Sequence, residues 1–180
     1  MKNQLVEKIQ QGDHDAFEGL FRNHYADLCR FACHYVKSSE IAEDLVQNVF
    51  LKIWQNHRNW RPRRTVKSYL YKAVHNQARN YARRKSVEKK WEEETAVSNV
   101  AHSPSSEAAW YEKELFTALE KAIEQLPKRC RMVFVLSRVN GLKYAEIAET
   151  LGISVRTVEV QMGRALEKLR RVLGPLLPPS

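Results

Sequence analysis

The sequence predicts an all-α fold of two small helical domains joined by a flexible linker. Apolar residues recur at helical spacing along most of the 180 residues, and alternating patterns typical of strands are few. This periodicity fails between Ser86 and Ala109, where the composition shifts to Glu, Ser, Ala, Asn and Pro. We therefore expect domains over residues 1–87 and 110–173, a mobile linker over 88–109 and a tail over 174–180.

The first domain is predicted to begin with a short helix and a long one. Leu5–Gln11 has a helical pattern that ends at Gly12. Asp13 or Asp15 is suited to cap the next helix, because a side-chain oxygen there accepts from free backbone N–H groups. The apolar stripe from Phe17 to Val36 makes this second helix long.

Two further helices complete the first domain. Ser38 or Ser39 is predicted to cap a helix whose apolar positions run from Ile41 to Trp54. His57–Lys67 is predicted to be a loop, because its proline disfavours helical geometry in the residue before it. Helical periodicity then resumes over Ser68–Lys85.

The second domain is predicted to contain a helix-turn-helix. Helices over Trp110–Gln125 and Lys128–Arg138 lead to a turn at Asn140-Gly141. Gly152 is suited to end the next helix in a left-handed turn, and Ser154 to cap the helix after it. The inward stripe of that last helix is expected to comprise Val155, Val158, Met162, Ala165, Leu166 and Leu169.

The opposite face of the last helix has side chains suited to a DNA major groove. Donors, acceptors, a methyl group and a small residue occur there together, as base edges and phosphates require. An ordinary helical corner with a solvated face is the alternative, since helix pairs joined by glycine also occur in proteins that do not bind DNA. The candidate residues are Arg156, Thr157, Glu159, Val160, Gln161, Gly163 and Arg164.

The formal net charge is +9, and the basic excess lies in one stretch. No Asp or Glu occurs from Leu45 to Val87, and we call this stretch the acid-free span. Such clustering favours a polyanion, since each neutralised phosphate releases counterions. A membrane surface is the alternative partner, but the Asn, Gln and Tyr content is unsuited to a lipid-facing stripe. The basic residues of the span are Lys52, Arg58, Arg61, Arg63, Arg64, Lys67, Lys72, Arg79, Arg83, Arg84 and Lys85.

Two segments carry a resemblance to a known family. GLKYAEIAETLGISVRTVEVQMGRALEKLR resembles region 4 of extracytoplasmic-function (ECF) sigma factors, and less closely the DNA-binding domain of LuxR-type regulators. AEDLVQNVFLKIWQ resembles region 2.2 of the same sigma group, which has no counterpart in a receiver domain. The resemblance implies that this helix docks on core RNA polymerase, whereas periodicity alone favours a solvated face. The implied polymerase-binding residues are Asp44, Gln47, Asn48 and Phe50.

A third segment, SYLYKAVHNQARNYARR, resembles regions 2.3 and 2.4, which bind the −10 element as an opened single strand. Aromatic, amide and basic side chains suit this task, because they stack, read and hold an unpaired strand. The resemblance places Trp60 and Asn76 at the pocket for a flipped-out base, although Trp60 as an ordinary core aromatic is an equal alternative. The other candidate residues are Arg61, Arg63, Arg64, Lys67, Lys72, Arg79, Asn80 and Arg83.

The resemblance implies an alternative sigma factor that binds core RNA polymerase, duplex −35 DNA and single-stranded −10 DNA, and that an anti-sigma factor restrains. Glu159 and Gln161 depart from the basic recognition helix of many members, so the −35 preference is expected to differ. The rival hypotheses are a stand-alone, dimeric helix-turn-helix regulator of duplex DNA and an adaptor that binds only proteins. The single-strand segment argues against the regulator, and the acid-free span argues against the adaptor.

The sequence indicates neither an enzyme nor a cofactor. Phosphate-binding loops, nucleophile motifs and metal-ligand spacings are not found in it. Cys29 and Cys33 lie one helical turn apart near His24 and His34, but buried, inert thiols are the favoured interpretation. No apolar run approaches the roughly 20 residues of a membrane span, and the first residues do not resemble a signal peptide. We therefore expect a cytoplasmic protein without a metal, a cofactor or direct membrane insertion.

Overall fold

The computed structural model describes residues 4–88 and 118–174. Contacts divide the chain into two units, Met1–Ser98 and Asn99–Ser180. Every regular element within the described ranges is helical, which confirms the predicted fold class. None of the helices described has the length and apolar character needed to cross a membrane. The predicted linker and tail lie outside these ranges except for their first residues, so the predicted domain boundaries stay predictions.

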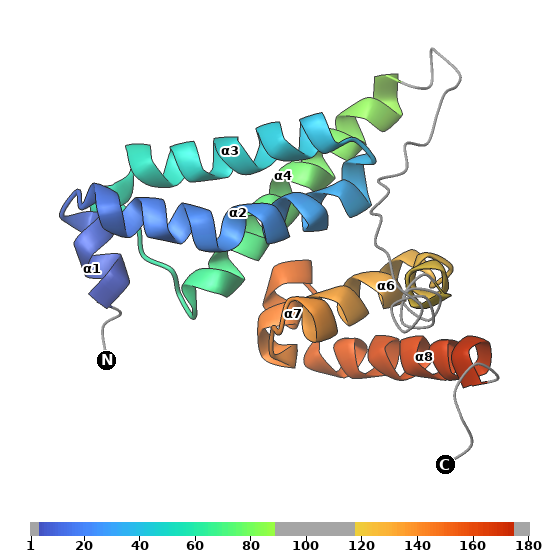
Figure 1. The fold of residues 1–180 in the computed structure, drawn as a ribbon. Coiled ribbons are helices and arrows are strands. Elements are labelled where there is room, and N and C mark those ends of the chain that lie inside the picture. Colours follow the sequence, from blue (N-terminus) through green and yellow to red (C-terminus); the bar gives the residue numbers. More distant parts are fainter. Residues whose placement is uncertain (1–3, 89–117, 175–180) are drawn as a thin grey trace, which may run out of the picture. The chain divides into compact units, whose positions relative to one another are not determined.

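The first unit consists of two long antiparallel helices that a third helix crosses (Figure 1). The long pair is α2, His14–Val36, and α3, Ser39–Gln55. Helix α4, Val66–Glu88, packs on both of them. Helix α1, Gln4–Gln10, lies at the end of the bundle and contacts the short 3₁₀ helix η1, His57–Asn59.

Side-chain caps decide where α2 and α3 begin. A carboxylate oxygen of Asp13 accepts a hydrogen bond from the backbone N–H of Ala16 at 2.9 Å, so Asp13 is the cap of α2 and Asp15 lies within its first turn. The hydroxyl of Ser38 accepts from the N–H of Ile41 at 3.3 Å and caps α3. The structure thus resolves both alternatives that the sequence left open.

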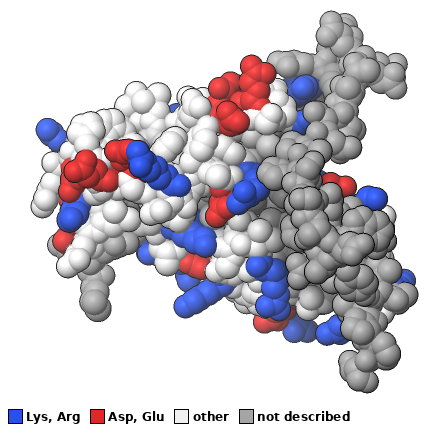
Figure 2. Space-filling view, in the orientation of Figure 1, with Lys and Arg blue, Asp and Glu red and all other residues white. Residues whose placement is uncertain are grey.

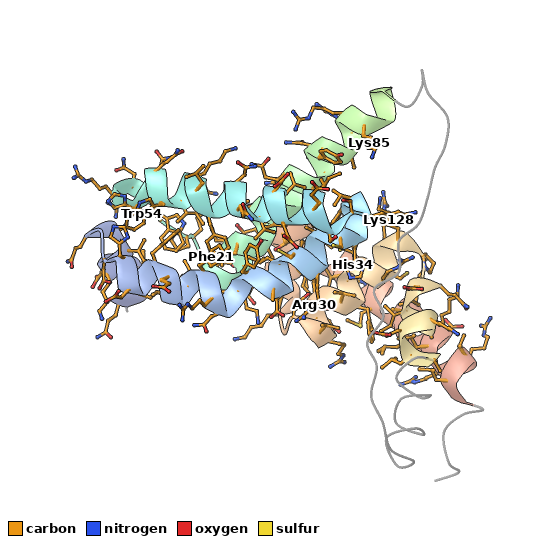
Figure 3. The ribbon with its side chains drawn as sticks, turned by 45° about the horizontal axis from the view of Figure 1, so that its top comes forward. Phe21, Arg30, His34, Trp54, Lys85 and Lys128 are labelled. Atoms are coloured by element: carbon orange, nitrogen blue, oxygen red, sulfur yellow. The ribbon has the colours of Figure 1, made fainter. Side chains whose placement is uncertain are left out.

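Aromatic rings fill much of the space between α2 and α3. The side chains of Phe21 and Trp54 lie between these two helices (Figure 3). Phe50 meets Phe21 edge to face, with ring centroids 4.9 Å apart. Further along α2, Phe31 meets Tyr71 of α4 in the same way at 5.1 Å. Because such rings bury large apolar areas, these contacts join the three long helices into one core.

Helix α4 is longer than the sequence predicts at both ends. It begins at Val66, two residues before the predicted Ser68, because the hydroxyl of Thr65 accepts from the N–H of Ser68 at 3.1 Å and closes the first turn. It ends at Glu88, three residues beyond the predicted Lys85. The loss of apolar periodicity after Lys85 therefore does not mark the end of the helix.

The second unit is a group of shorter helices. Residues 118–124 are helical, and α6, Lys128–Phe134, continues directly into a π-helical turn, η2, Val135–Val139. The backbone N–H of Asn140 donates to the carbonyl of Val135 at 2.9 Å, and Gly141 follows with a φ of 65°. The predicted helix over residues 128–138 is thus partly π-helical, and the predicted turn at Asn140-Gly141 is confirmed.

The helix-turn-helix consists of α7, Tyr144–Leu151, and α8, Val155–Leu173. Gly152 ends α7 with a φ of 66°, a left-handed conformation that glycine adopts at little cost. The hydroxyl of Ser154 accepts from the N–H of Thr157 at 3.0 Å and caps α8. Both predicted signals are confirmed. The inward stripe is narrower than expected, because Val155 is 42% exposed and Leu166 only half-buried.

Candidate nucleic-acid interface

A pocket of about 570 Å³ lies between α3, η1 and α4 in the first unit, and we call it the α3–α4 pocket. Helix α4 lines it with one face, because positions 69, 73, 76 and 80 recur at helical spacing. Most of the polar groups that line it are amides. The lining residues are Val49, Lys52, Ile53, Asn56, Asn59, Trp60, Arg61, Tyr69, Ala73, Asn76, Gln77 and Asn80.

Trp60 forms one wall of this pocket. Its side chain is 4% exposed, and its ring meets that of Tyr69 edge to face with centroids 5.8 Å apart. The backbone N–H of Trp60 donates to the carbonyl of His57 at 3.1 Å, which fixes the residue at the end of η1. Trp60 is therefore both a core aromatic and a lining residue of the pocket. The two interpretations that the sequence left open for it do not exclude each other.

Several cations of the acid-free span surround the α3–α4 pocket. Arg61 lines it, and Arg63 and Arg64 follow in the same exposed loop. Arg79 and Arg83 are exposed on α4, where each stands three residues after the lining residues Asn76 and Asn80. Residues at this spacing are neighbours on a helix surface, so Arg83 flanks the pocket, whereas the charge of Arg79 also acts on His75 and on Tyr35 of α2. Lys72 is half-buried, also within one turn of Asn76.

Lys67 has a different position from the other candidate cations. It stands about half a helical turn away from Tyr69 on α4, and its charge acts on His24 of α2. Burial lowers the pKa of His24, the charge of Lys67 lowers it further, and Asp27 opposes the shift. Lys67 thus lies near enough to α2 for its charge to act on His24, and it is not among the residues that line the α3–α4 pocket.

The sequence missed part of the pocket lining. The sequence pattern alone does not single out Tyr69, Lys52, Asn56, Asn59 or Gln77 as pocket residues. The spacing of Tyr69 to Asn76 was a usable signal, because it places both on one helix face. The contributions of α3 and η1 depend on tertiary packing, which the sequence pattern does not give.

The face of α2 and α3 that Figure 2 displays differs from this basic surface, because acidic and basic side chains occur there side by side. On α2, Arg22 pairs with Glu18, and Arg30 pairs with Asp27. Exposed pairs of this kind contribute little to stability and leave little net charge. The single-sign character of the acid-free span therefore does not extend over α2.

On α8, the candidate DNA-contacting residues fall into two groups. Arg156, Glu159, Gly163 and Arg164 are exposed, as is Val160 at 40%. Their spacing of three or four residues places them on one face. Arg156 and Glu159 form an ion pair at 3.3 Å within this face.

Two of the candidates on α8 are directed elsewhere. The hydroxyl of Thr157 exchanges a hydrogen bond with that of Ser154 at 2.8 Å and so belongs to the helix cap. The side-chain oxygen of Gln161 accepts from the thiol of Cys130 on α6 at 3.0 Å. Both side chains lie at the margins of the exposed face, because the fold already uses their polar atoms.

Helix α3 presents three of its four candidate residues at the surface. Asp44, Gln47 and Asn48 are exposed, and the amide of Gln47 donates to the hydroxyl of Tyr25 at 3.2 Å. Phe50 is 3% exposed and packs against Phe21, so we correct its assignment: it supports α3 from within the core. Leu51, which the sequence pattern does not single out, is 52% exposed and follows Asn48 and Asp44 at helical spacing.

The cysteines are buried or half-buried and free. Burial raises the pKa of Cys29 to about 11, although a hydrogen bond with Tyr25 opposes this shift and the charges of Glu43 and Cys33 add to it. Burial also raises the pKa of Cys33. Among the residues described, no three His, Cys, Asp or Glu side chains are grouped so as to hold a metal ion.

Comparison with known proteins identifies both units. Residues 20–87 match the family described as Sigma-70 region 2, and residues 116–169 match Sigma-70 region 4. The chain is 30% identical to RNA polymerase sigma factor CarQ of Myxococcus xanthus, over 95% of this chain and 97% of CarQ. It is 29% identical to RNA polymerase sigma-H factor of Pseudomonas aeruginosa, over 97% of this chain and 94% of that protein. The same identity relates it to the ECF sigma-E factor of Escherichia coli, over 96% and 94%.

Solved structures support the same fold. CnrH, solved in complex with the cytosolic domain of CnrY, gives a TM-score of 0.64 at 24% identity over 95% of this chain and 96% of CnrH. RpoE of Bartonella quintana, solved with the anti-sigma factor NepR, gives 0.69 at 22% over 88% and 96%. The match to region 2 also decides against a stand-alone regulator that carries only a helix-turn-helix. The chain belongs to the ECF sigma factors, non-enzymatic subunits with sigma-70 regions 2 and 4 that direct RNA polymerase in promoter recognition and transcription initiation.

Proposed function

We propose that the α3–α4 pocket receives a base flipped out of the −10 element. The observation that carries this proposal is that aromatic residues and amides line the same pocket, namely Trp60, Tyr69, Asn76 and Asn80. The half-buried ring of Tyr69 offers surface on which an unpaired base can stack, the buried Trp60 packs against Tyr69, and the amides form hydrogen bonds with the edge of the base. The exposed cations Arg61, Arg79 and Arg83 would hold the flanking phosphates.

The proposed interface with the −35 element is the exposed face of α8, where Arg156, Glu159, Val160 and Arg164 lie together. This combination suits a major groove, because guanidinium groups bind guanine or phosphate, a carboxylate accepts from cytosine and a methyl group contacts thymine. A Cβ added at Gly163 would meet nothing within 4 Å, so packing within the protein does not require this glycine. The small residue would let a DNA backbone approach closely.

The proposed polymerase-binding surface is the exposed face of α3, with Asp44, Gln47 and Asn48 and with Leu51 added. An exposed leucine among polar residues resembles the apolar centre of a protein interface. A second proposal concerns regulation, because RpoE of Bartonella quintana was solved in complex with an anti-sigma factor. We infer that an anti-sigma factor also restrains this chain, and that the chain acts in the cytoplasm, where it meets polymerase and DNA.

Run-off transcription provides the promoters for a test of the pocket. Core polymerase from the source organism, with and without this chain, would be given genomic fragments, and transcripts that depend on the chain define the promoters. A forked promoter fragment with 2-aminopurine at successive −10 positions then reports unstacking of a base by fluorescence. A protein that binds the chain and suppresses these transcripts would be the inferred anti-sigma factor.

Asn76→Ala and Asn23→Ala form a matched pair for this assay, since both asparagines are exposed and only Asn76 lines the pocket. Holoenzyme with Asn76→Ala is expected to bind the forked fragment about 1 kcal/mol more weakly and to lose the fluorescence increase at one position. Asn23→Ala is expected to behave as the native chain. Equal behaviour of the two variants would remove Asn76 from the base-binding site.

A further inference from the structure

Helix α1 precedes the part of the chain that matches region 2, residues 20–87, yet it contacts the loop that forms the pocket wall. The side-chain amide of Gln10 donates a hydrogen bond to the backbone carbonyl of Trp60 at 2.8 Å. These two residues stand 50 positions apart in the sequence. The contact therefore joins the beginning of the first unit to one of the residues that line the α3–α4 pocket.

Helix α1 is anchored in the first unit, so Gln10 is well placed to fix the loop that begins at Trp60. Ile9 has no exposed surface, which anchors α1 in the core. Gly12 turns the chain into α2 with a φ of 86°, and its N–H donates to the carbonyl of Ile9 at 3.0 Å. A Cβ at Gly12 would stand 3.8 Å from Nε2 of His57 in η1, so the turn also packs closely against η1.

The carbonyl of Trp60 is a sensitive point at which to hold this loop. The peptide bond is planar, so fixing the carbonyl oxygen of Trp60 also fixes the direction in which the chain continues to Arg61. Both residues line the pocket. From Trp60 to Thr65 the chain has no regular secondary structure. The path of this segment therefore depends on individual contacts such as the one from Gln10.

We propose that Gln10 is a positioning residue for the α3–α4 pocket, so that α1 controls how well region 2 binds the opened −10 strand. The inference rests on the proposed base-binding function of that pocket. Gln10 itself would not contact DNA. Its amide holds the carbonyl of Trp60, and this fixes the position of the pocket wall that the base would contact.

The test compares Gln10→Glu with Gln11→Glu in holoenzyme. Glu has nearly the shape of Gln but offers no amide donor, so Gln10→Glu breaks the bond to Trp60. Gln11 is exposed, and its substitution adds the same charge one residue further along. Gln10→Ala removes the donor without adding a charge. The measurements are affinity for the forked −10 fragment, discrimination between bases at the flipped position, affinity for duplex −35 DNA, and thermal unfolding.

We expect Gln10→Glu and Gln10→Ala to weaken binding of the forked fragment about three- to tenfold, as loss of one hydrogen bond predicts, and to reduce base discrimination. Binding of duplex −35 DNA should match that of Gln11→Glu, and the unfolding temperature should fall by no more than the loss of one hydrogen bond predicts. In a double-mutant cycle, the effect of Gln10→Glu should shrink when Asn76→Ala has already disabled the pocket. A general loss of stability would instead add to the effect of Asn76→Ala.

Each other outcome has a separate meaning. If Asn76→Ala impairs binding but both Gln10 variants match Gln11→Glu, the pocket stands and the positioning role of Gln10 is wrong. If the Gln10 variants lower −10 and −35 binding together with the unfolding temperature, Gln10 serves stability only and the inference is again wrong. If Asn76→Ala has no effect on the forked fragment, the base-binding pocket fails and the inference fails with it.

Discussion

The hydroxyl of Tyr35 on α2 lies 2.7 Å from Nδ1 of His75 on α4, and the two rings meet edge to face with centroids 5.3 Å apart. Burial raises the pKa of Tyr35, so its hydroxyl keeps its proton, and the tautomer of the neutral imidazole decides which of the two groups donates the hydrogen bond. Burial also lowers the pKa of His75 below its ordinary value of 6.5, and the charge of Arg79 lowers it further. The pair thus joins two of the long helices while His75 is neutral.

The pKa of His75 predicts a loss of stability in mild acid. Just below pH 6.5 the unfolded chain binds a proton that the folded chain binds only at lower pH, so the free energy of unfolding falls as the pH falls through this window. His24 shifts in the same direction. Urea unfolding at pH 8 and pH 5.5 should therefore show a smaller difference for His75→Gln than for the native chain. An unchanged difference would contradict this assignment.

Phe50 and Leu51 are neighbours on α3 with opposite exposure, which gives a matched pair of variants. Phe50→Leu should lower the free energy of unfolding by about 1 to 2 kcal/mol, because Phe50 is buried among rings. Leu51→Ala should change it by about 0.5 kcal/mol or less, but should weaken binding to core polymerase in a competition assay against native chain. If Leu51→Ala competes as well as the native chain, Leu51 lies outside the polymerase-binding surface.

Two glycines of the second unit should respond in opposite ways to alanine. Gly152→Ala should destabilise the second unit by about 1 to 2 kcal/mol, because its φ of 66° strains any side chain. Gly163→Ala lies within a helix and in open space, so it should stabilise by about 0.5 to 1 kcal/mol. It should nevertheless weaken binding of duplex −35 DNA in an electrophoretic titration. Unchanged binding by Gly163→Ala would mean that DNA does not approach this point of α8.

Arg164→Ala should weaken binding of duplex −35 DNA by about 1 to 3 kcal/mol through loss of a charge-assisted contact to a base or a phosphate. Arg171→Ala is the control, since it removes the same charge from the far end of α8, where Arg171 pairs with Glu167 at 3.2 Å. A fluorescence titration at two salt concentrations separates loss of a specific contact at Arg164 from the general effect of removing a positive charge. Equal losses for both variants would indicate a general electrostatic effect instead of a contact at Arg164.

Cys29 and Cys33 should react slowly with iodoacetamide at pH 8 in the folded protein. Burial raises the pKa of Cys29 to about 11, and only the thiolate is nucleophilic. Mass spectrometry after timed alkylation should show both thiols protected until urea unfolds the chain. Rapid modification of Cys29 in the folded protein would contradict this pKa.

The parts of the fold that the sequence predicted well depend on short-range chemistry. Gly152 and Ser154 act on backbone groups within three residues of themselves, so their pattern already contains the required geometry. The choice between Asp13 and Asp15 needed the structure, because both residue types are suitable caps and only the path of the chain after Gly12 distinguishes them.

The parts that the sequence missed depend on where a second element packs. The family resemblance places Phe50 among the polymerase-binding residues of α3, but the exposure of its side chain depends on how α2 covers that helix. Gln161 lies at the edge of the α8 face, and the thiol of Cys130 on α6 draws it inward. Asn56 and Asn59 lie in the short segment around η1, which has no apolar periodicity in the sequence. Their place in the pocket is therefore seen only in the folded unit.

The π-helical turn Val135–Val139 has a consequence for how related chains should be compared. A π turn holds one residue more than an α-helical path of the same length requires. A relative in which this segment is plain α-helix would therefore be one residue shorter between α6 and the Asn140-Gly141 turn. An alignment that forbids a gap here would shift every position of α7 and α8 by one, and would assign the proposed DNA-contacting positions to the wrong side chains.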